Sequence, residues 1–113
     1  MKTVLVVDDQ LGTRKIVKGI LKDAGYEKII VCESGEEALS HLGEADILIT
    51  DYLMGGVNGV ELAIKAKRQN PKMLVIIMTG TSRLLPSNHH ADSVLEKPFT
   101  VNRLLACLER VSQ

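Results

Sequence analysis

The chain has 113 residues, of which 45% are hydrophobic and 25% are charged. These values are ordinary for a globular protein and predict one domain, residues 1–113, with a single core. Lys and Arg together number 14, as do Asp and Glu, so net charge gives no case for nucleic-acid binding or membrane insertion. No apolar stretch approaches the roughly 18 residues of a membrane span. Met1 leads into a strand-like segment without a signal-peptide pattern, which favours the cytoplasm.

Short apolar runs alternate with amphipathic stretches, a pattern typical of α/β proteins with a parallel sheet. The apolar run in residues 4–9 (VLVVDD) predicts a first strand that two aspartates follow. A helix then runs to a stop near Gly25, and residues 29–32 predict the second strand. The inward face of this helix is predicted to hold Ile16, Val17, Ile20, Leu21 and Ala24.

The middle of the chain repeats this alternation. Ser34 and Glu37 form a candidate capping box for a short helix that extends through Leu42. Residues 46–50 predict the third strand, and Asn58 is a candidate cap for a helix that runs to about Gln69.

The last part of the chain predicts two more strands, residues 73–78 and 94–95, and a final helix from about Thr100. The apolar stripe of this helix is predicted to consist of Val101, Leu104, Leu105, Leu108 and Val111. Parallel strands need a crossover, yet residues 81–93 have no sustained helical period and contain Pro86. We therefore expect the fourth helix to be short or irregular.

Polar side chains end or follow four of the predicted strands. They are Asp8 and Asp9 after the first, Asp51 after the third, Thr79 after the fourth and Lys97 after the fifth. Carboxyl ends of parallel strands share one edge of an open sheet, so we expect these side chains to converge there. At about 4 Å and an effective dielectric near 20, each like-charge pair costs on the order of 4 kcal/mol. Three carboxylates must therefore raise a pKa or hold a cation, and oxygen ligands with room for water suit Mg2+.

The same residues have the properties that phosphoryl transfer needs. Aspartate is a nucleophile that forms acyl phosphates, lysine supplies a compact positive charge, and threonine supplies a hydroxyl donor. Each residue alone also has an ordinary structural interpretation, such as a helix cap, a turn residue or a solvated charge. Their placement at successive strand ends is hard to explain by those interpretations together, and indicates a phosphoryl-transfer site.

These motifs resemble the response-regulator receiver domain, the CheY-like family of two-component signalling. In that family an acidic pair follows strand one, a phosphoacceptor Asp ends strand three, Thr or Ser ends strand four, and Lys-Pro follows strand five. The family stretch D-x-x-M-P-x-x-[DN]-G is matched by DYLMGGVNG at residues 51–59. GEEAL at residues 35–39 is equally typical of the second helix. The resemblance covers nearly the whole chain.

The resemblance implies a flavodoxin-like (βα)5 three-layer sandwich whose parallel sheet has the order 2-1-3-4-5. It also implies that Asp51 accepts a phosphoryl group from the phosphohistidine of a sensor histidine kinase or a histidine phosphotransfer protein. Output would follow by contact with an unknown downstream protein. The chain would thus be a switch, and no enzyme beyond its own phosphorylation and dephosphorylation.

The resemblance further assigns roles within the site. Mg2+ would be required, with Asp9 and Asp51 as direct ligands, Asp8 acting mainly through water, and the backbone carbonyl of Leu53 as a third protein ligand. Thr79 and Lys97 would bind the phosphoryl oxygens. The bond between Lys97 and Pro98 is cis in relatives.

Three departures from the family pattern lie outside the phosphorylation chemistry. Gly55 stands where Pro usually follows the Met, which adds backbone freedom to the loop after Asp51. Val94 replaces the usual Tyr or Phe, so the aromatic lever of the family is missing. The linker between Thr79 and Lys97, residues 80–96, is several residues shorter than is typical. We predict that phosphorylation occurs but that its readout differs from the aromatic-switch scheme.

Other functions fit the sequence less well. A phosphorylation-independent interaction module on the same fold is the main alternative, favoured by the three departures and opposed by the complete set of site residues. A phosphatase of the haloacid-dehalogenase type needs Asp-x-Asp after its first strand, and Asp8 is followed two positions later by Gln10. A nucleotide- or flavin-binding protein would need a Gly-rich loop after the first strand, which is not present.

Overall fold

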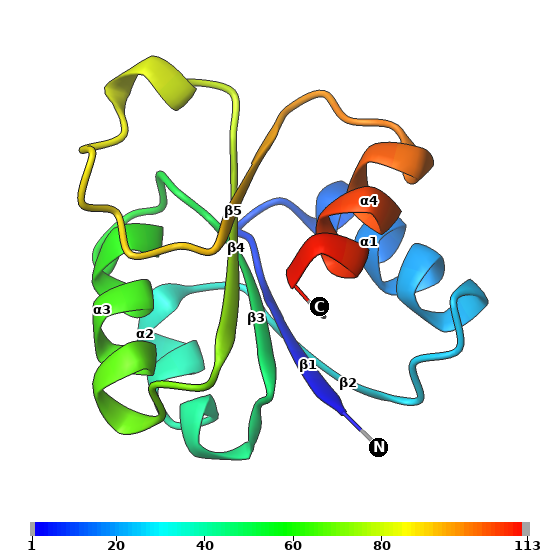
Figure 1. The fold of residues 1–113 in the computed structure, drawn as a ribbon, viewed down its shortest axis with the longest axis horizontal. Coiled ribbons are helices and arrows are strands. Elements are labelled where there is room, and N and C mark those ends of the chain that lie inside the picture. The colour runs from blue at the N-terminus through cyan, green and yellow to red at the C-terminus, as the bar shows by residue number, and fades with distance from the viewer. Residues whose placement is uncertain (1, 112–113) are drawn as a thin grey trace.

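A five-stranded parallel sheet forms the middle layer of the protein, with helices on both faces (Figure 1). The computed structural model describes residues 2–111. The strands are β1 (Thr3–Val7), β2 (Lys28–Cys32), β3 (Ile47–Asp51), β4 (Leu74–Thr79) and β5 (Ser93–Glu96). The helices are α1 (Leu11–Asp23), α2 (Gly35–Leu39), α3 (Gly59–Gln69) and α4 (Val101–Val111), with 3-10 turns η1 (Leu42–Glu44) and η2 (Ser82–Leu84). The strand order β2-β1-β3-β4-β5 confirms the predicted flavodoxin-like topology.

The sheet is buried on both faces, which explains why its strands read as continuous apolar runs. In β1, Val4 and Val6 enter the core under α1 and α4, whereas Leu5 and Val7 enter the core under α2 and α3. β3 and β4 divide their side chains between the two cores in the same way. The central strands are therefore fixed from both sides, and their carboxyl ends have a defined position.

The helices bury fewer of their apolar residues than the periodicity predicted. Val17, Ile20 and Leu21 of α1 are buried, but Ile16 is 60% exposed and Ala24 is also exposed, so these two were wrongly assigned to the inward face. In α4 the predicted stripe is wrong at Val101, which is 52% exposed. The remaining face of α4 packs on the sheet through Leu104, Cys107, Leu108 and Val111. Ile16 lies in the middle of α1 and lines a surface pocket with Pro98 and Phe99 instead of entering the core, so periodicity alone overestimates the buried face.

Helix caps define the starts of α2 and α3. Asn58 and Glu61 form a complete capping box, with Asn58 Oδ1 accepting the N–H of Val60 and of Glu61. At α2, Ser34 Oγ accepts the N–H of Glu37, while the Glu37 carboxylate accepts the N–H of Glu33 rather than that of the cap residue. The second helix also ends at Leu39 and does not reach Leu42 as predicted.

Residues 80–92 connect β4 to β5, and within this described segment the longest regular element is the three-residue turn η2. This confirms the expectation that the crossover between β4 and β5 would hold only a short or irregular helix. Asp92 attaches the end of the segment to β4: its N–H donates to the Val75 carbonyl at 2.8 Å, and its Oδ2 accepts the Val75 N–H at 2.8 Å. The Lys67 ammonium on α3 donates to the same carboxylate at 2.8 Å.

Among residues 2–111, no helix is both long enough and apolar enough to cross a bilayer.

Candidate functional site

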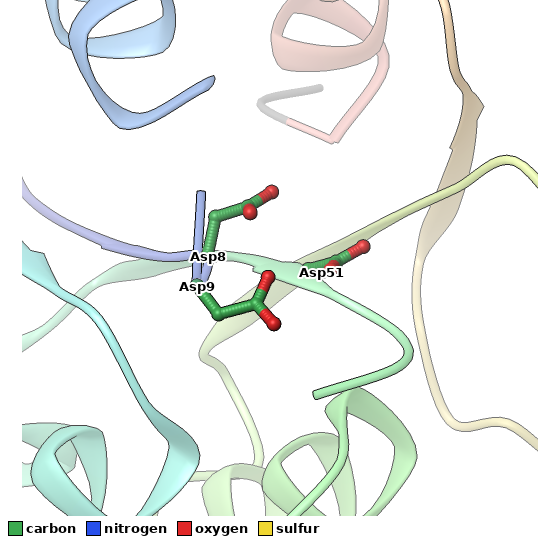
Figure 2. Close-up of side chains that lie close together, drawn as sticks. All are labelled: Asp8, Asp9 and Asp51. Atoms are coloured by element: carbon green, nitrogen blue, oxygen red, sulfur yellow. The ribbon is translucent and has the colours of Figure 1, made fainter. Parts of the chain in front are cut away.

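Three carboxylates meet at the carboxyl edge of the sheet (Figure 2). β1 and β3 pair in parallel with Val7 opposite Thr50, so the residues that follow on each strand reach the same edge. One oxygen from each of Asp8, Asp9 and Asp51 lies within 4.8 Å of the others. Figure 2 shows the Asp9 carboxylate turned toward Asp51. The tertiary structure thus brings together the acidic residues that the sequence singled out.

Lys97 joins this cluster from the end of β5, the edge strand next to β4. Its ammonium donates to Asp8 Oδ2 at 2.8 Å and lies 3.2 Å from Asp51 Oδ1. Asp8 is fully buried, and its other oxygen accepts the N–H of Gln10 at 2.9 Å. The Arg14 guanidinium donates to the Asp8 backbone carbonyl at 2.8 Å. Both carboxylate oxygens of Asp8 therefore have protein partners, whereas Asp9 is exposed to solvent.

Burial and charge shift the protonation of this cluster. Burial raises the pKa of Asp51 and the neighbouring Asp8 carboxylate raises it further, while Lys97 opposes both effects. For Lys97, burial alone would lower the pKa, but the hydrogen bond to Asp8 and the attraction of Asp51 outweigh it and raise the pKa. Lys97 is therefore charged and fixed between two carboxylates, where it would face any anion that binds at Asp51.

Thr79 is the last residue of β4, at the strand end where the sequence placed it, and its side chain is buried. Its hydroxyl contacts a residue that the sequence did not single out. Thr79 Oγ1 accepts the N–H of Thr81 at 2.9 Å and lies 3.0 Å from Thr81 Oγ1. Beyond it, Ser82 in η2 donates a hydrogen bond to the carboxylate of Glu96 at the end of β5. No sequence motif indicates Thr81, because a local turn decides this contact.

The loop between β3 and α3 is close to the Asp51 backbone. A side chain at Gly59 would overlap the Asp51 carbonyl and lie 3.0 Å from Tyr52 Cα, so this position needs glycine. The Gly59 N–H donates to the Tyr52 carbonyl at 2.8 Å. Leu53, whose backbone carbonyl is the expected metal ligand, lies in this loop with a half-exposed side chain. The peptide bond between Lys97 and Pro98 is cis, as expected from the resemblance.

Comparison with known proteins decides the family. The family model described as "Response regulator receiver domain" matches residues 4–109. The chain belongs to this family. It is a receiver domain of two-component signalling, and proteins of this kind act in signalling.

Relatives of this receiver domain include a protein of similar length and one about twice as long. It is 28% identical to the chemotaxis protein CheY of Pseudomonas aeruginosa, over 96% of this chain and 94% of that protein. It is 33% identical to the transcriptional regulatory protein CpxR of Escherichia coli, over 98% of this chain but 49% of CpxR. The chain therefore spans about half the length of CpxR.

Solved structures agree with this relationship. The response regulator TrrA of Thermotoga maritima, solved in complex with Mg2+-BeF, superposes with a TM-score of 0.88 at 31% identity and covers 98% of this chain and 99% of TrrA. The chemotaxis protein CheY4 of Vibrio cholerae superposes with a TM-score of 0.86 at 30% identity, over 98% of both chains. Both comparisons support the flavodoxin-like fold.

The receiver domain's acidic cluster has the donor chemistry that Mg2+ requires. Mg2+ prefers oxygen ligands, is usually bound by one or two carboxylates and retains several waters. Asp9 is exposed, and the side chain of Asp51 is 12% exposed, so both have access to hydrated ions. Asp8, whose two oxygens are already occupied, is better suited to act through water. The residues present therefore fit the metal typical of this family.

Proposed function

We propose that this receiver domain is a phosphorylation-dependent signalling switch, in which Asp51 accepts a phosphoryl group from the phosphohistidine of a sensor histidine kinase or a histidine phosphotransfer protein. The observation that supports this most directly is the gathering of three carboxylates within 4.8 Å, with the Lys97 ammonium 3.2 Å from Asp51 Oδ1. If a kinase is the donor, the exchange takes place in the cytoplasm.

In the proposed reaction, an Asp51 carboxylate oxygen attacks phosphorus and forms the O–P bond of an acyl phosphate. The N–P bond of phosphohistidine breaks, and its electron pair stays on the imidazole nitrogen. Lys97 then donates to a phosphoryl oxygen, since its ammonium already lies beside Asp51. No separate substrate is turned over, so the chain acts on its own phosphorylation state and not as an enzyme on other molecules.

Metal binding belongs to the same proposal. Asp9 and Asp51 would hold Mg2+ directly, Asp8 would act through water, and the Leu53 carbonyl would be a further ligand. When bound, Mg2+ would neutralise part of the charge on the carboxylates and on the phosphoryl oxygens. Asp8 keeps Lys97 in place through the 2.8 Å hydrogen bond, so the cation of the protein is positioned before any phosphoryl group arrives.

Phosphorylation would be read out by a protein partner. To bind a phosphoryl oxygen, the Thr79 hydroxyl would turn from Thr81, whose N–H it accepts at 2.9 Å. Val94 has no aromatic ring to respond to that change. We therefore propose that the signal passes through residues 80–84 rather than through an aromatic side chain on β5.

Intact mass measured after incubation with Mg2+ and acetyl phosphate or phosphoramidate tests the proposal. We expect the wild type to gain one phosphoryl group and Asp51→Asn to gain none. Absence of an adduct on the wild type, together with no response to beryllofluoride, would instead favour the phosphorylation-independent module.

A further inference from the structure

The loop between β3 and α3, residues 52–58, connects the phosphoacceptor Asp51 to α3 and contains two adjacent glycines. Tyr52 at its start donates its N–H to the Met78 carbonyl at 2.9 Å, and Asn58 at its end caps α3. Between these two anchors, residues 53–56 make no backbone hydrogen bond to any other part of the described chain, residues 2–111. Gly55 also lacks the ring that would restrict its backbone.

Glu36 on α2 reaches across to this loop. Its Oε2 accepts the N–H of Val57 at 3.2 Å, although the two residues are 21 positions apart. The carboxylate also lies against Gly56, whose φ is +82°. A Cβ at Gly56 would overlap Glu36 Oε2 and lie 2.9 Å from Glu36 Cδ. The positive φ favours glycine at this position, and any larger residue would have to displace the Glu36 carboxylate from its present place.

A second contact brings α2 close to the same loop. Gly35, the first residue of α2, is buried against Val57. A Cβ at Gly35 would overlap the Val57 carbonyl and lie 2.8 Å from Val57 Cβ. The backbone of α2 therefore rests directly on the loop, and Glu36 follows at the position from which its carboxylate reaches the Val57 N–H.

From these contacts we infer that Glu36 is a positioning residue for the metal site. It fixes the loop that contains Leu53 by accepting the Val57 N–H, and so compensates for glycine at position 55. The inference rests on the proposed function, since it assigns Glu36 a role toward the Mg2+ held at Asp51. Glu36 acts through the loop backbone and does not itself ligate the ion.

This role predicts a specific ranking of variants in Mg2+ affinity, measured by calorimetric titration of the metal-free protein. Glu36→Ala removes the acceptor, and we expect Mg2+ binding to weaken roughly three- to tenfold. Glu36→Gln removes the charge but keeps an oxygen acceptor, so its affinity should stay within about twofold of the wild type. Glu37→Ala removes an equal charge from the same helix and also removes the carboxylate that accepts the Glu33 N–H at the start of α2, so it is the control for a weakened α2 without loss of the Val57 contact.

Hydrogen exchange of the Val57 amide gives a readout that does not depend on activity. Exchange should accelerate in Glu36→Ala and remain near the wild-type rate in Glu36→Gln and Glu37→Ala. The glycines provide a second comparison. Gly56→Ala should weaken Mg2+ binding, whereas Gly55→Ala, where a Cβ would meet nothing within 4 Å, should not.

The outcomes separate this inference from the proposed function. If the wild type binds Mg2+ and Glu36→Ala binds it as well as Glu37→Ala does, the inference is wrong and the proposed function stands. An equal loss in Glu36→Gln and Glu36→Ala would also overturn it, because charge and not the hydrogen bond would then matter. If the wild type binds no Mg2+ and forms no phosphoryl adduct, the proposed function fails and the inference fails with it.

Discussion

Two regions at the carboxyl edge of the sheet differ in how they are held: the acidic cluster around Asp51, and residues 80–92 between β4 and β5. The cluster lies at the ends of strands that are buried on both faces, and Lys97 connects Asp8 to Asp51 across the edge. Residues 80–92 are mostly exposed and contain the short turn η2. Their firmest attachments are the contacts of Asp92 with β4 and Lys67.

This difference explains how the segment can shorten while the site stays complete. The positions of the site residues depend on strand pairing and on the two cores, to which residues 80–92 contribute little beyond Leu85 and Ala91. A change in the segment therefore alters the surface that a partner would contact without displacing Asp51 or Lys97. Under the proposed function, chemistry and readout would be separable in this receiver domain, because different packing determines the position of each region.

The largest expected difference between the two regions is in the free energy of unfolding after alanine substitution of a glycine beside each of them. Gly59→Ala should lower the free energy of unfolding by about 3 kcal/mol, because the new Cβ meets the backbone of Asp51 and Tyr52. Gly80→Ala, at the start of the segment, should change it by less than about 0.5 kcal/mol, since the nearest atom would be the Lys97 carbonyl at 3.9 Å. Urea unfolding measures both, and equal losses would contradict the difference in packing.

Removal of the lysine that contacts a carboxylate of each region, Lys97 at Asp8 and Lys67 at Asp92, is expected to have an intermediate effect. Lys97→Met leaves Asp8 buried without its cation and should cost about 1–3 kcal/mol of unfolding free energy in metal-free buffer. Lys67→Met leaves Asp92 its hydrogen bond from Val75 and should cost about 1 kcal/mol.

The two lysine variants should also differ in chemistry. The rate of adduct formation from acetyl phosphate, followed by intact mass, should fall for Lys97→Met and stay at the wild-type value for Lys67→Met. A comparable fall in Lys67→Met would mean that the segment takes part in the reaction, and the separation of the two regions would then be wrong.

The smallest effect is expected on the surface of the segment itself. Leu84 in η2 is 66% exposed, so Leu84→Ser should change the unfolding free energy by less than about 0.5 kcal/mol and leave adduct formation unchanged. Leu85→Ser is the matched comparison, because Leu85 packs against the core under α2 and α3, and it should cost about 1 kcal/mol. A larger loss at Leu84 than at Leu85 would reverse the assignment of which residue attaches the segment.

Hydrophobic periodicity predicted most of the fold because the sheet is buried on both faces. Each central strand reads as an unbroken apolar run, and a parallel sheet requires crossover helices between such runs. The predicted bounds of β3 and β4 are each one residue too early, since Asp51 and Thr79 prove to be the last residues of those strands. The helical faces were less predictable. Ile16 and Val101 fit the local period, but their exposure depends on which neighbours the tertiary structure places beside them.

The sequence by itself determined which residues converge at the site, because strand ends in a parallel sheet share one edge whatever the details of packing. Only the tertiary structure decided how those residues are held. The pairing of Lys97 with buried Asp8, the contact of Thr79 with Thr81 and the bond from Val57 to Glu36 join segments through turns and side-chain directions. Contacts of this kind have no period and no fixed spacing, so no pattern in the chain could have indicated them.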